Sequence, residues 1–164
     1  MAENNFTLTT FYTAWKAYQD RLAAALSPLT AEQLALRAGP GLRSVGENAL
    51  HIVGTRISWF TEFLGEESDA EVNAIANWDD LDASARSGAE RGQALATTWR
   101  LIADCLARWS PTDMEQTFPD DWDGEQVQLS RAWVVWHVLE HDLHHGGEIS
   151  LTLGMHGLQA GFTS

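Results

Sequence analysis

The sequence has one cysteine, few basic residues and no long apolar run, and each scarcity excludes a class of protein. The single thiol, Cys105, cannot form a disulfide within the chain, and no second cysteine completes a metal-binding or redox motif, so we interpret it as structural. No apolar stretch approaches the roughly 18 residues that a membrane span needs. The opening segment, MAENNFTLTT, lacks the basic and apolar regions of a signal peptide, so we expect a cytoplasmic protein with no membrane partner.

Acidic residues outnumber basic ones by 23 to ten, which gives a formal net charge of −13. This charge repels the phosphates of nucleic acids, so no direct nucleic-acid binding is expected. Apolar residues are abundant: they make up 45% of the chain, and eight tryptophans are present, which is typical of a packed globular protein. At 164 residues, we expect one domain spanning residues 1–164.

Hydrophobic periodicity predicts four long amphipathic helices. They are expected over residues 9–26, 44–64, 82–109 and 131–154, with a short helix over 30–37. The acidic segment 66–80 is expected to be a surface connection without chemical function, and 111–128 a small hairpin or an ordered loop. Almost no strand signal is present. The sequence therefore predicts an all-α domain of the four-helix-bundle kind.

Four of the six histidines lie within HVLEHDLHHGGEIS, which falls in the middle of the last predicted helix. His137, His141 and His145 are successive i, i+4 neighbours, and His144 and Glu148 lie beside them within an arc of about 100°. Apolar residues such as Leu143 occupy other sides of the helix, so we expect the helix to be deeply buried. Buried imidazoles need partners, and a metal ion is an efficient one.

Two histidines one helical turn apart can bind a single ion, but a third ligand must come from elsewhere. His51 is the natural candidate, since it lies on the second long helix, whereas His156 lies beyond the predicted helix end at Gly154. The spacing alone allows either His137 with His141 or His141 with His145 as the pair. A histidine without a metal partner is also a common satisfied core residue.

The pattern SVGENALHIVG, followed some 90 residues later by VWHVLEHDLHHGGEI, resembles the DinB/YfiT-like family of metal-dependent proteins over essentially the whole chain. The resemblance implies a four-helix bundle with a metal held by His51, His141 and His145. His137, His144 and Glu148 would then support the ligands or line the pocket. The family's common ending is HHRGQI, and here Gly146 replaces the arginine and Glu148 the glutamine. The resemblance also implies a homodimer.

Three imidazoles leave a metal position open, which is typical of a catalytic site, and zinc suits them best, with nickel, iron or manganese as alternatives. Some relatives use low-molecular-weight thiols, so our leading hypothesis is a thiol-dependent S-transferase that acts on a small-molecule substrate.

One alternative is a divalent-metal hydrolase that activates a bound water, with Glu47, Glu140 or Glu148 as the general base. Another is a non-catalytic stress-response or DNA-damage-response protein of the same fold, and a third is a fold that has lost its metal.

Overall fold

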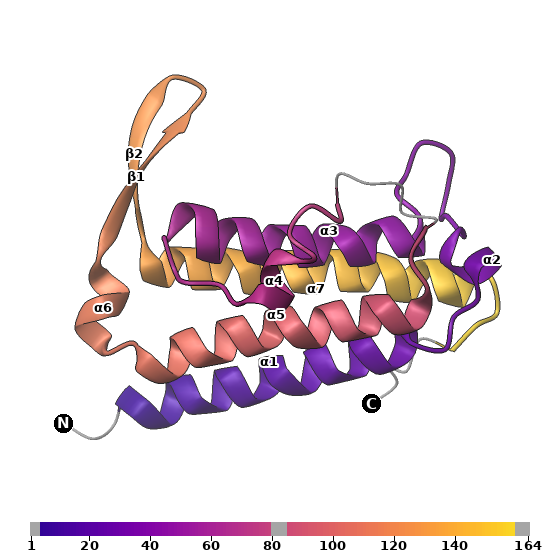
Figure 1. The fold of residues 1–164 in the computed structure, drawn as a ribbon, viewed down its shortest axis with the longest axis horizontal. Helices are drawn as coiled ribbons and strands as arrows, with labels where there is room; N and C mark the ends of the chain where they lie inside the picture. Colours follow the sequence, from indigo (N-terminus) through magenta and orange to yellow (C-terminus); the bar gives the residue numbers. More distant parts are fainter. Residues whose placement is uncertain (1–3, 80–84, 160–164) are drawn as a thin grey trace.

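The computed structural model describes residues 4–79 and 85–159, and within them the fold is dominated by helices (Figure 1). The elements in chain order are α1 (Asn4–Leu26), α2 (Ala31–Leu34), α3 (Val45–Ile57), the π-helix η1 (Ser58–Phe63), α4 (Ala70–Asn73), α5 (Gly88–Arg108), α6 (Pro111–Glu115), β1 (Thr117–Trp122), β2 (Glu125–Ser130) and α7 (Arg131–Met155). Among the helices in these ranges, none has both the length and the apolar character that a membrane span requires.

Capping residues set where the helices begin. Ser44 accepts a hydrogen bond from the backbone of Glu47, whose side chain accepts one in return from the Ser44 backbone. Such a capping box satisfies backbone N–H groups that the first helical turn leaves without partners. Thr30 forms a second capping box at the start of α2, and Ser130 caps the start of α7. The third long helix, α5, begins at Gly88 after a capping box at Ser87. Of the residues before it that were predicted to be helical, 85–87 are not α-helical and 82–84 lie outside the described residues.

A two-stranded antiparallel hairpin, β1 and β2, lies between α6 and α7 and projects from one end of the helices (Figure 1). Asp123 and Gly124 connect the strands, and both have positive φ, which matches the twist of a tight hairpin turn. The residues at this turn read DWDGEQ, with the Asp-Gly pair at its centre. The hairpin alternative for this segment is therefore confirmed, and helix α6 precedes it.

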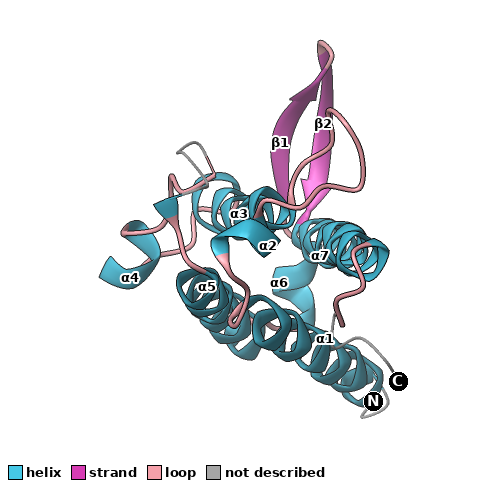
Figure 2. Ribbon diagram, turned by 90° about the vertical axis from the view of Figure 1, so that its right-hand side faces the viewer, coloured by secondary structure: helices cyan, strands magenta, loops and turns pink. Residues whose placement is uncertain are grey.

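The four long helices pack around a shared apolar core. Helix α1 packs on α5, α5 on α3, and α3 on α7, and in Figure 2 these helices surround a common centre. The fully buried core side chains include Trp15, Leu22, Ile52, Phe60, Leu95, Ile102, Ile149 and Leu153. One prediction about burial was wrong, because Leu143 on α7 is 45% exposed. Helix α7 therefore has one face open to solvent.

A buried ion pair lies inside the helices and links all four. The guanidinium of Arg56 on α3 donates to the carboxylate of Asp142 on α7, with an Nη2–Oδ2 distance of 2.6 Å, and neither side chain is exposed. Trp15 on α1 donates its indole N–H to the same carboxylate at 2.7 Å. Arg56 also donates to Gln19 on α1 and to Thr98 on α5. Because these charges are paired and hydrogen-bonded, the network fixes how the helices sit against one another.

Candidate metal centre

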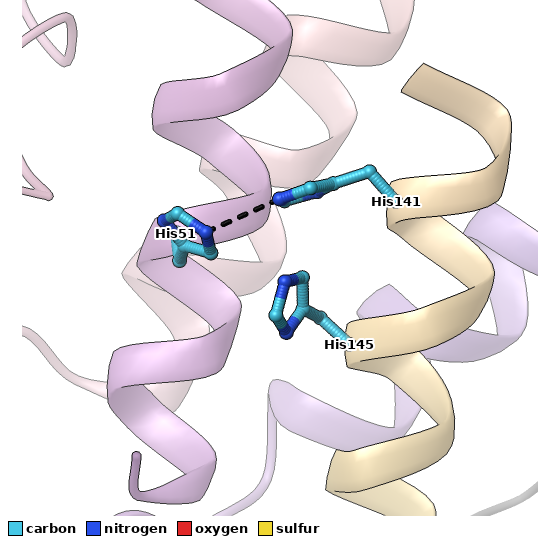
Figure 3. Close-up of side chains that lie close together, drawn as sticks. All are labelled: His51, His141 and His145. Atoms are coloured by element: carbon cyan, nitrogen blue, oxygen red, sulfur yellow. Dashed lines mark hydrogen bonds between the residues drawn. The ribbon is translucent and has the colours of Figure 1, made fainter. Parts of the chain in front are cut away.

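Three histidines from two facing helices converge: His51 from α3, and His141 and His145 from α7 (Figure 3). One nitrogen of each ring lies within 4.8 Å of the others. The Nε2 atoms of His51 and His141 are 3.1 Å apart, and Thr55 Oγ1 lies 3.2 Å from His141 Nε2. Helices α3 and α7 run antiparallel (Figure 1). Residues three or four positions apart on α3 therefore face residues three or four positions apart on α7, in successive rows.

Two of the three rings have a carboxylate beside their Nδ1 atom. His51 Nδ1 lies 2.8 Å from Asp79 Oδ2, and His145 Nδ1 lies 2.8 Å from Glu148 Oε2. An ionised carboxylate only accepts hydrogen bonds, so Nδ1 carries the proton in each neutral ring and Nε2 keeps its lone pair. Carboxylates in this position orient metal-binding histidines and raise their basicity.

The geometry and the charge state of the rings both fit a divalent ion. Two ligands about 2.0 to 2.1 Å from a tetrahedral ion are roughly 3.4 Å apart, close to the observed separation of the His51 and His141 nitrogens. Burial, with the nearby imidazoles of His145 and His51 as a smaller cause, lowers the pKa of His141 to about 3. Burial also lowers the pKa of His145, against the opposing effect of Glu148. Neutral imidazole is the form that binds metals.

His141 has a further property that fits a ligand. Its Nδ1 is buried and has no hydrogen-bond partner among the described residues. The ring is therefore not held through Nδ1, as the rings of His51 and His145 are. Its position is defined by what Nε2 faces, which is the other histidines and the hydroxyl of Thr55.

Asp79, which contacts His51, was not predicted as a site residue, because the acidic segment 66–80 was expected to be a surface connection without chemical function. The carboxylate reaches α3 beside Gly54, where an added Cβ would lie 2.9 Å from the Asp79 Cβ. Gly54 thus leaves the space in which Asp79 approaches His51, one turn away on the same helix. Nothing in the acid-rich run NWDD distinguishes this aspartate from its neighbours.

His137 lies beside the three converging histidines but, among the described residues, is not a member of that group. Its ring is 6.3 Å from that of His141. It stacks on Trp133 at 4.9 Å with an interplanar angle of 10°, and Trp59 meets it edge-on at 5.0 Å. Its Nδ1 is 3.6 Å from a carboxylate oxygen of Glu140. His137 therefore forms part of an aromatic wall next to the centre.

The remaining predicted residues lie at the edges. His144 is 61% exposed, and its Nε2 is 3.4 Å from Glu148 Oε1. Glu47 is held by the guanidinium of Arg37 and by the Ser44 cap. The hydrogen bond from Arg37 is the largest cause of its lowered pKa. Both carboxylates are thus already engaged with other side chains.

Comparison with known proteins identifies the family of the chain. The family model described as the DinB family matches residues 1–163. The chain belongs to the DinB family. Among solved structures, a DinB-like protein from Bacillus cereus is similar, with a TM-score of 0.67 and 19% sequence identity over 92% of this chain and 93% of that one. No curated protein sequence matches the chain. Membership of the DinB family and the histidine cluster are compatible with divalent-metal binding.

The departure of this DinB-family chain from the common HHRGQI ending has a structural explanation. A Cβ on Gly146 would lie 2.0 Å from the hydroxyl oxygen of Tyr18 on α1, so the tyrosine occupies the space of any side chain there. At the neighbouring Gly147, by contrast, an added Cβ would meet no atom within 4 Å. An arginine at position 146 is incompatible with Tyr18 in this place.

Proposed function

We propose that this DinB-family protein is a metal-dependent enzyme in which His51, His141 and His145 bind one divalent ion. The observation that carries the proposal is the convergence of three imidazoles, two of them fixed through Nδ1 by carboxylates. Zinc is the first candidate because three imidazoles suit it, and nickel, iron and manganese are alternatives.

The residues around the centre have distinct tasks in this proposal. Asp79 and Glu148 keep the protons of His51 and His145 on Nδ1, so that both Nε2 atoms point inward. Thr55 places a hydroxyl beside His141. When bound, a divalent ion would supply Lewis-acid activation of a small ligand, either a thiol or a water.

We favour thiol-dependent S-transfer over hydrolysis because of how the carboxylates are engaged. A hydrolase needs a general base within reach of the water. Of the predicted bases, Glu47 is paired with Arg37, Glu148 with His145, and Glu140 is 56% exposed beside His137. A low-molecular-weight thiol that loses its proton on binding a metal needs no such base.

The metal assignment is tested by the metal content of the purified protein, measured by mass spectrometry. We expect about one ion per chain, lost in His51→Ala, His141→Ala and His145→Ala, because two imidazoles hold an ion far less tightly than three. His156→Ala is the control, since His156 is an exposed histidine at the C-terminal end of α7 and belongs to neither group of possible ligands among the described residues. Stoichiometric metal that persists in all three ligand variants would overturn the assignment.

The reaction class is tested by a screen of small thiols with electrophilic acceptors, run beside ester and amide substrates. We expect turnover that requires both the thiol and the bound metal. Turnover of esters or amides without thiol would replace the transferase with a hydrolase. Metal binding without turnover in either set would favour the non-catalytic alternative.

We also propose that the chain forms one domain of the four-helix-bundle kind and that two copies associate. The buried network between Arg56 and Asp142, which joins α1, α3, α5 and α7, supports a single packed unit. The open face of α7 supports a homodimer, since it exposes Trp136, Leu143 and Leu151. The molar mass in solution tests the dimer. The net charge of −13 supports a small-molecule substrate and not a nucleic-acid partner.

A further inference from the structure

A second group of metal-binding side chains lies on α7, beside the three converging histidines. His144, His145 and Glu148 each offer a ligand atom, and these atoms lie within 4.8 Å of one another. The carboxylate of Glu148 lies between the two rings, with Oε2 2.8 Å from His145 Nδ1 and Oε1 3.4 Å from His144 Nε2. Imidazole nitrogen and carboxylate oxygen are both common ligands of zinc. We call these three residues the outer group.

The outer group is more exposed than the proposed metal centre. The side chains of His144 and Glu148 are 61% and 44% exposed, whereas the side chain of His51 is 22% exposed and His141 Nδ1 is buried. His144 and Glu148 are also four residues apart on one helix, so their side chains are neighbours that can bind one ion together. An ion in solvent can therefore reach the outer group directly.

The ring of His145 joins the outer group to the metal centre. Its centroid lies 4.3 Å from that of His141 and 4.8 Å from that of His51, and it lies 4.7 Å from that of His144. Its Nδ1 faces Glu148 of the outer group, which leaves Nε2 for an ion in the centre. The same imidazole thus belongs to both sets of possible ligands.

The position of one proton decides which set His145 can serve. A neutral imidazole binds an ion through one nitrogen, because the other nitrogen carries the proton. With the proton on Nδ1, where Glu148 accepts a hydrogen bond from it, His145 can serve only the metal centre. With the proton on Nε2, the Nδ1 atom can bind an ion together with His144 and Glu148.

We propose that the outer group is an entry site, which binds a divalent ion from solvent and passes it to the three-histidine centre. The proposal rests on the proposed metal function of that centre. As the ion moves inward, its bonds to His144, Glu148 and His145 Nδ1 break, and bonds to His145 Nε2 and the two other histidines form. His145 loses its Nε2 proton to water and gains one from water at Nδ1, so the charge of the ring is unchanged.

The first test follows the uptake of cobalt(II) by the metal-free, full-length protein after rapid mixing, since cobalt bound by several histidines absorbs visible light. We expect His144→Ala to take up cobalt at least about tenfold more slowly, because its outer group keeps only two ligands. Release to an excess of chelator should slow by the same factor, so that the affinity of the centre stays at the wild-type value.

His156→Ala is the control for these rates, because this exposed histidine belongs to neither group among the described residues. Its uptake and release should equal those of the wild type. Uptake by His144→Ala at the wild-type rate would overturn the proposal. Slower uptake with unchanged release would also overturn it, because His144 would then contribute to affinity and not to entry.

A second test isolates the outer group from the centre. The double variant His51→Ala/His141→Ala removes two ligands of the centre and leaves the outer group complete. We expect calorimetric titration to show that it binds cobalt less tightly than the wild type, and that adding His144→Ala abolishes this binding. Equal binding by the double and the triple variants would overturn the proposal.

The two tests separate this proposal from the proposed function. A wild-type protein that binds no ion at the three-histidine centre would overturn the proposed function and the entry role together. A centre that binds its ion in His144→Ala at the wild-type rate would overturn the entry role alone.

Discussion

At the scale of single residues, the proposed centre depends on side chains that do not face the metal position. Asp79 fixes the tautomer of His51, and Glu148 fixes that of His145. His141 has no such partner at Nδ1 among the described residues, and burial lowers its pKa. Asp79, which orients His51, comes from a different segment of the chain, so its role can be tested without changing any ligand.

Replacing Asp79 should weaken metal binding without unfolding the protein. We expect Asp79→Ala to lower metal affinity roughly 10- to 100-fold, because the His51 ring loses the acceptor that orients it. Asp79→Asn should fall between the wild type and Asp79→Ala, since its carbonyl oxygen still accepts a hydrogen bond but carries no charge. Competition with a chromophoric chelator measures these affinities.

Asp20→Asn is the control for this series, because Asp20 makes an exposed ion pair with Lys16 on α1. Its metal affinity should equal that of the wild type. If Asp79→Ala also keeps wild-type affinity, Asp79 does not position His51.

At the scale of the elements, the centre depends on the register between α3 and α7. His141 is followed directly by Asp142, whose carboxylate is held by Arg56 of α3 inside the protein. Sliding either helix by one turn would break this pair and separate His51 from His141. The ion pair and the histidine cluster thus depend on the same register between α3 and α7. Breaking the ion pair therefore tests how much this register contributes to stability.

Neutralising Asp142 should therefore destabilise the folded protein. We expect Asp142→Asn to lower the free energy of unfolding by about 3–5 kcal/mol, because the charge of Arg56 stays buried without its counter-ion. Urea denaturation of the metal-free protein measures the loss. The double variant Arg56→Met/Asp142→Asn should be less destabilised than the sum of the two single variants, since no unpaired charge remains. Additive losses would mean that the two side chains do not act as a pair.

The sequence predicted the helices better than it predicted what joins them. Helix starts at Ser44 and Ser130 were predictable because capping is local, and the Asp123–Gly124 turn is local in the same way. The start at Ser87 was missed because the helical periodicity was extended too far toward the N-terminus. Leu143 was assigned to the core because periodicity shows which residues share a face, not which face a neighbouring helix covers.

The candidate site was predictable to the extent that spacing within a helix defines it. The HxxxH spacing placed His141 and His145 on one face, and the position of His51 on the second long helix made it the candidate for a third ligand. The family resemblance then selected His141 with His145 over His137 with His141. Asp79 and the buried Arg56–Asp142 pair were not predictable, because each contact joins segments far apart in the sequence and neither residue type signals its partner.

At the scale of the whole molecule, the buried histidines couple stability to pH. The pKa of His141 is lowered from 6.5 to about 3 in the folded protein, whereas the unfolded chain keeps an ordinary value. Between these values the unfolded chain binds more protons than the folded one, so acid favours unfolding. The stabilising contribution is complete above about pH 6.5 and is lost progressively as the pH falls toward 3.

We therefore expect the metal-free protein to lose unfolding free energy between about pH 7 and pH 5, as measured by urea denaturation at each pH. His141→Phe should lose less over the same range, because it removes the buried group that must be protonated. His144→Phe, at an exposed position, should retain the wild-type dependence. Identical pH dependence in His141→Phe and the wild type would show that His141 contributes nothing to it.

The separation of the ligands along the chain gives the centre a second effect. His51 and His141 lie 90 residues apart, so an ion held by both would close most of the molecule into a covalent-like loop. A disulfide of that span would restrict the denatured chain by roughly 4–5 kcal/mol at 25 °C. An ion that leaves on unfolding instead stabilises the folded chain by mass action, by about 2.7 kcal/mol at a hundredfold excess over its Kd. In this protein, which has one cysteine, the ion would be a cross-link that a chelator removes. Its melting temperature would therefore rise with the concentration of available metal.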